Sequence, residues 1–253
     1  MFACSPYPRH ENFLEEVRAE VTQQAFRINH HACLTIWGGN NEIETSFDWY
    51  KESAANKQLF SVDFAELFID TVMPAVHRPG FTDIAFVDTS PSNGPISHDP
   101  QDPYVKRWGD SGSWDQGDVH FYDYVNDAFD PDTYPRAKFV SEFGVMSLPS
   151  WHIYQQYTRS EDWNRRVPRH PSGCGTPMGM QSWLYQLWTY LTQVQQAHAY
   201  DVAISHWRRL KGAPDARTMG VLYWQLNDIW AERSVLVPAG AKQRGLFVGA
   251  SDV

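Results

Sequence analysis

The chain lacks both a surplus of basic residues and a long apolar run. Its 253 residues hold 21 Lys and Arg against 30 Asp and Glu, a formal net charge of −9. Binding to nucleic acid needs clustered positive charge, so no nucleic-acid partner is expected. No apolar run approaches the roughly 18 residues that span a bilayer, so no membrane segment is expected either. Residues 1–6 have neither the charged nor the apolar part of a signal peptide, and we predict no targeting signal in this chain.

Cysteine is also scarce. Cys4, Cys33 and Cys174 are odd in number and form no CxxC pair, which favours separate thiols, with Cys33 buried, over disulfides or a zinc site. His30 and His31 are sequence neighbours that do not share a helix face, and no carboxylate lies at ligand spacing from them. We therefore expect no metal site.

Helical and strand patterns alternate along the chain. Apolar residues at three-to-four spacing predict helices over about 13–28, 62–73 and 182–210. Pro74 and the Pro79-Gly80 pair mark the exit of the second helix. Short apolar runs predict strands at 33–37, 84–87, 119–122, 138–141 and 220–224. A loop rich in Gly, Pro, Asp and Ser covers about 91–117. This alternation predicts an α/β fold whose five strands are parallel and adjacent in chain order, with crossover helices outside.

The predicted sheet fits either a β/α barrel or an open doubly wound fold. No predicted strand is followed by a glycine-rich phosphate turn, which removes support for a dinucleotide-binding fold. In a β/α barrel, catalytic residues lie at the C-terminal ends of the strands. The two folds are therefore separated by asking whether polar side chains follow the strands.

Polar and aromatic residues do gather at the predicted strand ends. Glu42 follows the first strand and Glu142 the fourth, while the third carries His120 and Tyr122. Glycoside hydrolysis uses two such carboxylates: one protonates the leaving oxygen, and the other attacks the anomeric carbon or activates water. Taken singly, each Glu is equally well explained as a helix-start or loop charge, and Asn40 and Asn41 as turn residues. Their coincidence favours a site.

Aromatic residues make up 15% of the chain, with eleven Trp and twelve Tyr. A large aromatic core explains this excess, and so does a site that stacks rings against a sugar. Composition does not separate the two explanations.

Residues 37–42 read WGGNNE, residues 139–150 read FVSEFGVMSLPS and residues 218–230 read TMGVLYWQLNDIW. These resemble, in that order, the W-x-G-N-N-E, S-E-[FY]-G-x-x-S-x-P-S and T-M-G-x-L-Y-W-Q-L-N-D-x-W segments of the β-mannosidases of glycoside hydrolase family two. Residues 1–4, 117–124 and 191–193 look similar to animal members, and the likeness is collinear over roughly residues 1–230.

The resemblance implies a TIM-type (β/α) barrel and a retaining exo-β-mannosidase that removes terminal non-reducing β-D-mannose by double displacement. Glu42 would be the general acid/base and Glu142 the nucleophile, with carboxyl groups about 5–5.5 Å apart. The implied substrate-binding residues are Asn41 at the hydroxyl beside the anomeric carbon, Trp224 beneath the sugar, and Tyr122 and Trp49. The implied partner is a β-mannoside oligosaccharide, with no metal or organic cofactor. Full-length members would be lysosomal or secreted.

The chain departs from the family at both ends. If its first strand is the family's fourth, residues 1–230 hold strands four to eight of an incomplete barrel, and the β-sandwich domains are absent. Residues 231–253 do not resemble the family and are predicted to be a divergent tail. Two alternatives stay open: another family-two glycosidase (a β-galactosidase or β-glucuronidase), and an inactive, truncated fragment. Residues 223–228 favour the mannosidase over the other glycosidases.

Overall fold

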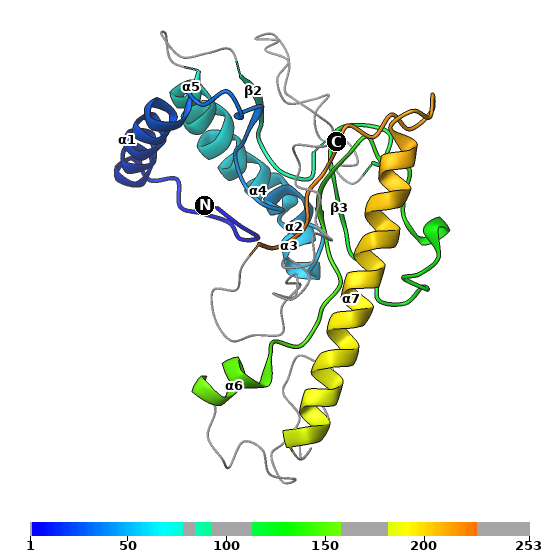
Figure 1. Ribbon diagram of the computed structural model, residues 1–253. Helices are drawn as coiled ribbons and strands as arrows, with labels where there is room; N and C mark the ends of the chain where they lie inside the picture. The colour runs from blue at the N-terminus through cyan, green and yellow to red at the C-terminus, as the bar shows by residue number, and fades with distance from the viewer. Residues whose placement is uncertain (1, 78–83, 93–112, 158–181, 227–253) are drawn as a thin grey trace. The chain divides into compact units, whose positions relative to one another are not determined.

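The computed structural model describes residues 2–77, 84–92, 113–157 and 182–226 (Figure 1). The chain divides into two compact units: unit 1 is Met1–His120 with Ala137–Ser141, and unit 2 is Phe121–Arg136 with Glu142–Val253. None of the helices in the described ranges combines the length and apolar composition that a membrane crossing requires. The tail 231–253, residues 227–230 and most of the predicted loop 91–117 lie outside the described residues, so the division at residue 230 stays a prediction.

Unit 1 is built on helix α1 (Glu11–Ile28) and a second helical run. The sequence predicts α1 to within two residues, and the His10 ring caps it by accepting a hydrogen bond from the Phe13 amide. The second run consists of α4 (Lys57–Phe64), the π-helix η1 (Ala65–Val72) and α5 (Met73–Val76), and it lies beside α1 (Figure 1). Helices α2 (Ile43–Ser46) and α3 (Lys51–Ala55) precede it. The core they enclose contains Leu14, Val17, Ile43, Phe47, Phe64, Leu67, Phe68, Val72 and Phe86.

The helical run ends at Val76, between the two predicted exit signals: Pro74 lies inside the run, and the Pro79-Gly80 pair lies outside the described residues. Pro74 is in the first turn of α5, directly after the π-helix η1.

Four of the strands are shorter than predicted, β4 is one residue longer, and the five form two sheets. β1 (Ile36–Gly38) pairs in parallel with β2 (Ala85–Val87). β3 (Val119–Phe121), β4 (Phe139–Phe143) and β5 (Gly220–Val221) form a second sheet in the order β3-β4-β5. Chain order within each sheet is confirmed, whereas the prediction of five adjacent strands is wrong at the β2–β3 step. Among the described residues, the segment after β2 is joined to the start of β3 by side-chain hydrogen bonds and by a backbone bond from the Asp118 amide to the Ser92 carbonyl (3.2 Å).

The first predicted strand, 33–37, begins late because residues 31–34 make a turn, with the Leu34 amide bonded to the His31 carbonyl at 3.1 Å. Cys33 is therefore exposed, and its predicted burial is wrong. Cys4 is also an exposed free thiol, and Cys174 lies outside the described residues.

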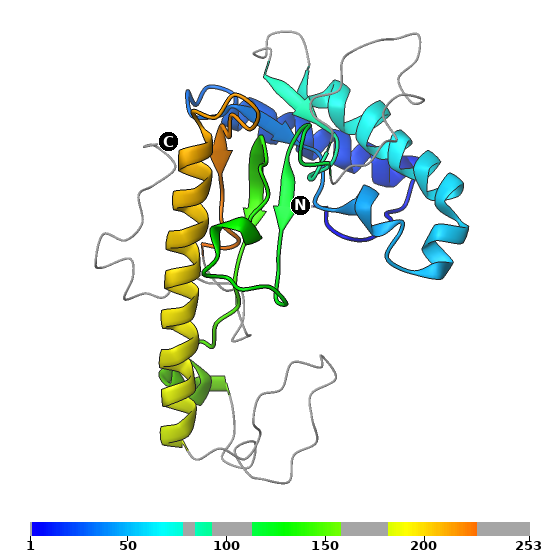
Figure 2. The same cartoon turned by 90° about the vertical axis from the view of Figure 1, so that its right-hand side faces the viewer.

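Unit 2 is organised around helix α7 (Ser182–Leu210), which has the predicted bounds and runs alongside β5 (Figure 2). Helix α6 (Trp151–Tyr157) and a 3-10 turn, η2 (Pro131–Thr133), complete it. Trp207 on α7 is fully buried and donates its indole N–H to the Pro135 carbonyl at 2.8 Å. Its ring packs against Phe143, Tyr134 and Phe121. Part of the aromatic excess therefore lies in the hydrophobic core of unit 2.

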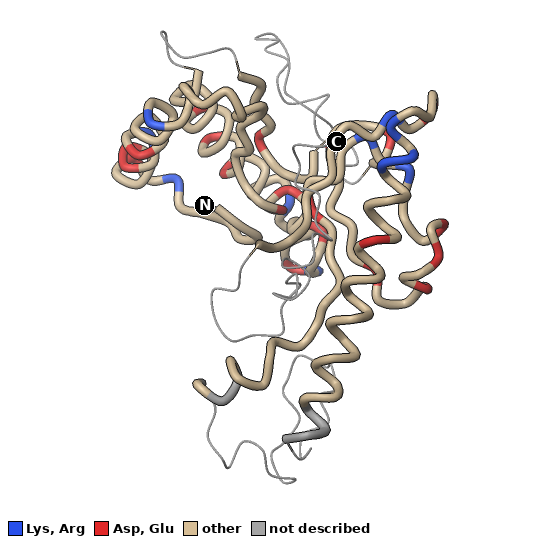
Figure 3. Tube along the Cα trace, in the orientation of Figure 1, with Lys and Arg blue, Asp and Glu red and all other residues tan. Residues whose placement is uncertain are grey.

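The last turn of α7 carries Arg208 and Arg209, and Figure 3 shows basic residues gathered near this end of the helix. Positive charge at this end of a helix interacts favourably with the unsatisfied carbonyls and the helix dipole.

Candidate active site

The end of β1 is fixed by Asn40, whose side chain is buried. Its amide donates to the Asp88 carbonyl (2.7 Å), and its oxygen accepts bonds from the Thr89 hydroxyl (2.7 Å) and the Ile43 amide (3.1 Å). The Asn40 side chain therefore links the ends of β1 and β2 through hydrogen bonds, and this role, rather than a preference for turn conformations, explains the asparagine. It also fixes the start of α2, immediately after Glu42.

Asn41 lies between two neighbouring segments. It forms isolated parallel bridges to Ala3 and to Ser90, and its side-chain amide donates to the Cys4 sulfur at 3.5 Å. The N-terminal residues thus line the end of β1 as a third extended segment, which contributes Cys4.

Glu42 has a left-handed backbone, with φ 58° and ψ 15°. An L-residue in this region costs on the order of 1 kcal/mol or more, and such residues concentrate at functional sites. The strained conformation is held by a bond from the Glu42 amide to the Ser90 carbonyl (2.8 Å) and by the Ser46 amide, which donates to the Glu42 carbonyl (2.8 Å).

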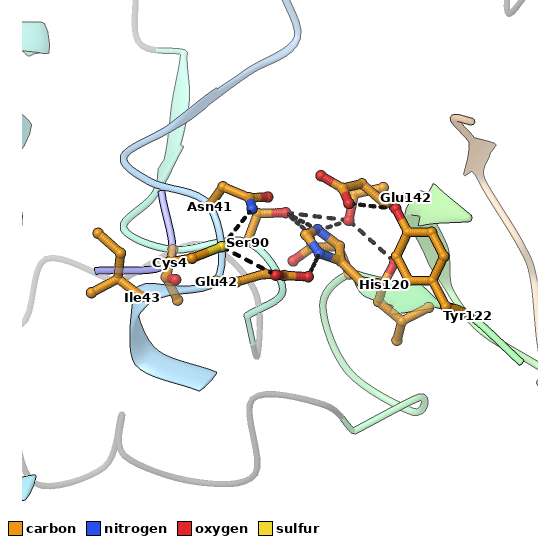
Figure 4. Close-up of polar contacts among 12 residues, drawn as sticks. Cys4, Asn41, Glu42, Ile43, Ser90, His120, Tyr122 and Glu142 are labelled. Carbon is orange, nitrogen blue, oxygen red and sulfur yellow. Dashed lines mark hydrogen bonds and ion pairs between the residues drawn. The ribbon is translucent and has the colours of Figure 1, made fainter. Parts of the chain in front are cut away.

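The Glu42 carboxylate lies in a group of polar residues that we term the Glu42 cluster: Cys4, Glu42, Ser90, Asp118 and His120, all in unit 1 (Figure 4). Oε1 of Glu42 lies 2.7 Å from Nδ1 of His120, and Oε2 accepts from the Cys4 thiol at 3.4 Å. The other His120 nitrogen, Nε2, is 2.9 Å from the Ser90 hydroxyl, which in turn bonds to Asp118 at 2.6 Å.

Burial and bonding act in opposite directions on the pKa of Glu42. Burial is the largest single influence, and it raises the pKa. The hydrogen bond from His120, the charge of His120 and the hydrogen bond from the Cys4 thiol all lower the pKa, and together they outweigh burial. The net effect is a lowered pKa. The lowered pKa favours the carboxylate form of Glu42.

Unit 2 holds the second carboxylate. Glu142, near the end of β4, accepts a hydrogen bond from the Tyr122 hydroxyl at 2.8 Å (Figure 4). Tyr122 directly follows β3.

Trp224 lies just beyond β5 and continues its pairing with β4, because its amide donates to the Phe143 carbonyl at 2.9 Å. Its side chain is half-buried, and its peptide bond to Gln225 is cis.

The structure brings some of the predicted site residues together. Asn41 and Glu42 share contacts with Cys4, and Tyr122 bonds to Glu142. Trp49 is exposed (46%) in the turn after α2, and its amide bonds to the Ser46 carbonyl. Its contact with a sugar stays a prediction, as do the separation of the Glu42 and Glu142 carboxylates and the roles given to them.

Sequence reasoning missed Cys4, Ser90 and Asp118 as members of the cluster. Asp118 was detectable, because residues 118, 120 and 122 alternate and so share a strand face. Cys4 and Ser90 carry no such signal, since Ser90 is placed by its own bridge with Asn41, and Cys4 by the bridge that the preceding residue, Ala3, makes with Asn41.

Glu42 and His120 are both residue types that bind metals, but here their ligand atoms bond to each other. The expected absence of a metal or organic cofactor stays a prediction.

Comparison with known proteins finds relatives along nearly the whole chain. No protein-family model matches. The β-mannosidase of Bos taurus is 33% identical over 255 residues, covering 91% of this chain and 28% of its own length. The β-mannosidase A of Aspergillus niger is 31% identical over 268 residues, covering 90% of this chain and 28% of its own length.

A solved structure shows the same fold. The crystal structure of a β-D-mannosidase from Dictyoglomus thermophilum matches 93% of this chain with a TM-score of 0.63 and 22% identity, over 28% of its own length. The chain therefore spans a little over a quarter of the relatives it matches.

Proposed function

This chain belongs by sequence to the β-mannosidases, and we propose that it is the segment of a retaining exo-β-mannosidase barrel that carries both catalytic carboxylates. Its substrate would be a terminal non-reducing β-D-mannoside. The strands β1 to β5 would be strands four to eight of the barrel, residues 1–230 the catalytic portion and residues 231–253 a separate tail. A lysosomal or secreted location belongs to the same proposal.

The different partners of the two carboxylates support distinct roles for them. Glu42 faces an imidazole, which gains and loses a proton near neutral pH and so can exchange one with the carboxylate. A general acid/base needs such an exchange, because it donates a proton in the first step and accepts one in the second. This contact is the single observation that carries the proposal.

Glu142 instead accepts a bond from a phenol. A tyrosine hydroxyl keeps its proton at neutral pH and only donates to a carboxylate, which favours the ionised form that a nucleophile needs. The carboxylate can then attack the anomeric carbon and form a covalent glycosyl-enzyme. Asn41, Trp224, Tyr122 and Trp49 would contact the sugar.

Leaving-group chemistry tests the two roles. Glu142→Gln should abolish turnover of every mannoside, because no glycosyl-enzyme forms. Glu42→Gln should lose about 10²–10⁴-fold with a poor leaving group, the typical contribution of acid/base catalysis. With dinitrophenyl mannoside, which needs no proton, it should instead give a burst, followed by slow turnover that azide partly restores. Glu52→Gln, in the exposed first turn of α3, is the matched control and should behave as wild type.

Equal loss in both catalytic variants, with azide helping neither, would show that the roles are misassigned. Comparing nitrophenyl mannoside, galactoside and glucuronide separates the mannosidase from the other glycosidases. The inactive-fragment alternative predicts that the 253-residue chain is silent on all three, while a version lengthened by any upstream reading frame is active.

A further inference from the structure

Asp118 is the most heavily bonded carboxylate of the Glu42 cluster. Oδ1 accepts from the Ser92 amide (2.8 Å) and the Ser92 hydroxyl (3.0 Å). Oδ2 accepts from the Ser90 hydroxyl (2.6 Å) and the Ser141 hydroxyl (2.5 Å). Four donors occupy the lone-pair positions of one carboxylate, which requires the acceptor-only, ionised form of Asp118.

Ser90 has a single hydroxyl proton to give. Its shortest bond is the one to Asp118, at 2.6 Å against 2.9 Å to His120 and 3.3 Å to Ser141. Because an ionised carboxylate can only accept, the Ser90 proton points to Asp118. The Ser90 oxygen must then accept from His120, which places a proton on Nε2 of the imidazole.

The opposite side of the ring faces Glu42. Nδ1 and Oε1 lie 2.7 Å apart, a distance that requires a proton between them. Since Nε2 is already protonated, this proton is additional to that of a neutral imidazole. It makes either an imidazolium beside a carboxylate or a neutral imidazole beside a carboxylic acid. The titratable groups that face this proton within unit 1 are Glu42 and His120 themselves, Cys4 at Oε2, and Asp118 through Ser90.

We propose that Asp118 and Ser90 are positioning residues that hold His120 in its Nε2–H form, so that Glu42 and His120 share one transferable proton. The tautomer follows from the hydrogen bonds alone, whereas the use of the proton rests on the proposed function. In the first step Glu42 passes a proton to the leaving oxygen, which also takes the electron pair of the broken C–O bond. His120 supplies that proton through Nδ1 and becomes neutral.

The second step restores the pair. After the first step the Nδ1 lone pair faces the Glu42 carboxylate, and this repulsion makes Glu42 a stronger base. Glu42 then takes a proton from the attacking water, whose oxygen forms the new bond to the anomeric carbon while the bond to Glu142 breaks. One proton has left with the first product and one has entered from water, so the Glu42–His120 pair returns to its starting state.

Nuclear magnetic resonance of the 253-residue chain with ¹⁵N-labelled histidine tests the tautomer without any need for activity. His120→Gln assigns the signal. In the wild type, Nε2 should carry the proton of the neutral ring, so that the shared proton is the one at Nδ1. A neutral wild-type His120 with its proton on Nδ1 would overturn the proposal.

Ser90→Ala removes the acceptor at Nε2. The neutral ring should then carry its proton on Nδ1 and donate it to Glu42, which reverses the pattern of the two nitrogen shifts. Ser90→Thr keeps a hydroxyl and should retain the wild-type pattern. Ser92→Ala is the matched control, because it removes one bond to Asp118 and none to Ser90 or His120. An unchanged tautomer in Ser90→Ala would refute the positioning role.

If Ser90→Ala does not fold, Asp118→Asn provides the same test. An asparagine cannot accept four bonds, which frees the Ser90 proton for Nε2 and favours the Nδ1–H tautomer.

A kinetic measurement separates the relay from the function itself. In Ser90→Ala the Glu42–His120 pair, once it has lost its shared proton, is stabilised by the new bond from Nδ1–H to Glu42. The basic limb of the kcat/KM profile against pH, measured with a poor leaving group, should therefore move to lower pH by about one pH unit. Dinitrophenyl mannoside should show no such move. If neither the 253-residue chain nor a version lengthened by an upstream reading frame hydrolyses a mannoside, the proposed function is refuted, while the resonance measurement still decides whether Ser90 and Asp118 set the tautomer of His120.

Discussion

Two adjacent glycines provide a sharp test of how β1 is seated against β2. A Cβ added at Gly39 would lie 2.5 Å from the Asp88 carbonyl oxygen and 3.1 Å from the edge of the Phe86 ring, whereas a Cβ added at Gly38 would meet nothing within 4 Å. Real Cβ atoms essentially never lie within 3.0 Å of such a backbone atom. Gly39→Ala must therefore push β1 away from β2, while Gly38→Ala fits without movement.

The cost can be worked out from the bonds at that position. Displacing β1 strains the bond from the Gly39 amide to the Val87 carbonyl (2.8 Å) and the bond from Asn40 to the Asp88 carbonyl (2.7 Å). Each is worth about 0.5–1.5 kcal/mol, and overpacking adds about 1–3 kcal/mol. We expect Gly39→Ala to lower the free energy of unfolding by about 2–5 kcal/mol. Gly38→Ala should be neutral or stabilising by up to about 1 kcal/mol.

Urea unfolding followed by circular dichroism measures both variants on the same chain. A free energy for Gly39→Ala within about 0.5 kcal/mol of that for Gly38→Ala, the scatter expected for surface changes, would refute the close approach of the two strands.

Three further predictions concern other positions. Gln196→Leu on α7 should lower the unfolding free energy by about 2–4 kcal/mol, because it leaves the Val145 carbonyl and the buried Ser147 hydroxyl without their bonds to Gln196. Gln195→Leu, on the exposed face of the same helix, should be near neutral in the same urea experiment. Cys4→Ala removes one of the hydrogen bonds that lower the Glu42 pKa, so a carboxylate ¹³C titration should show that the Glu42 pKa rises. The control is Cys33→Ala, which removes another exposed thiol. No rise in Cys4→Ala, or an equal rise in Cys33→Ala, would contradict the contact between Cys4 and Glu42. Burial, followed by the charges of Asp123 and Asp127, raises the Tyr134 pKa to about 12. Since an unfolded tyrosine titrates near pH ~10, the stability that the protonated phenol contributes is complete below that pH and is lost as the pH rises toward about 12. Phenolate absorbance that grows before unfolding, rather than with it, would contradict this reading.

The sequence by itself determined the order and type of the main elements. The apolar period of α1 and α7 is long and regular, so both helices appear almost where the pattern predicts them. The sequence also placed both carboxylates near strand ends: Glu142 is the penultimate residue of β4, and Glu42 lies four residues beyond β1. Local patterns of this kind need only neighbouring residues, which is why sequence alone contains them.

Strand limits and the division into two sheets were decided by tertiary structure. Strands of two to five residues carry too little periodicity to fix their ends, and their pairing depends on partners far along the chain. The turn at 31–34, which exposes Cys33, is one consequence. A second consequence is the break between the two sheets, where side chains rather than strand pairing join the end of β2 to the start of β3.

The chemistry around Glu42 is likewise a product of the fold. Its partner His120 is 78 residues away, the Asp88 carbonyl that fixes Asn40 is 48 residues from it, and Cys4 is 38 residues from Glu42. A sequence names the residue types that can exchange a proton, but a hydrogen bond forms only within about 3 Å. That proximity, and with it the direction of each proton in the Glu42 cluster, is set by strand pairing and not by any local pattern.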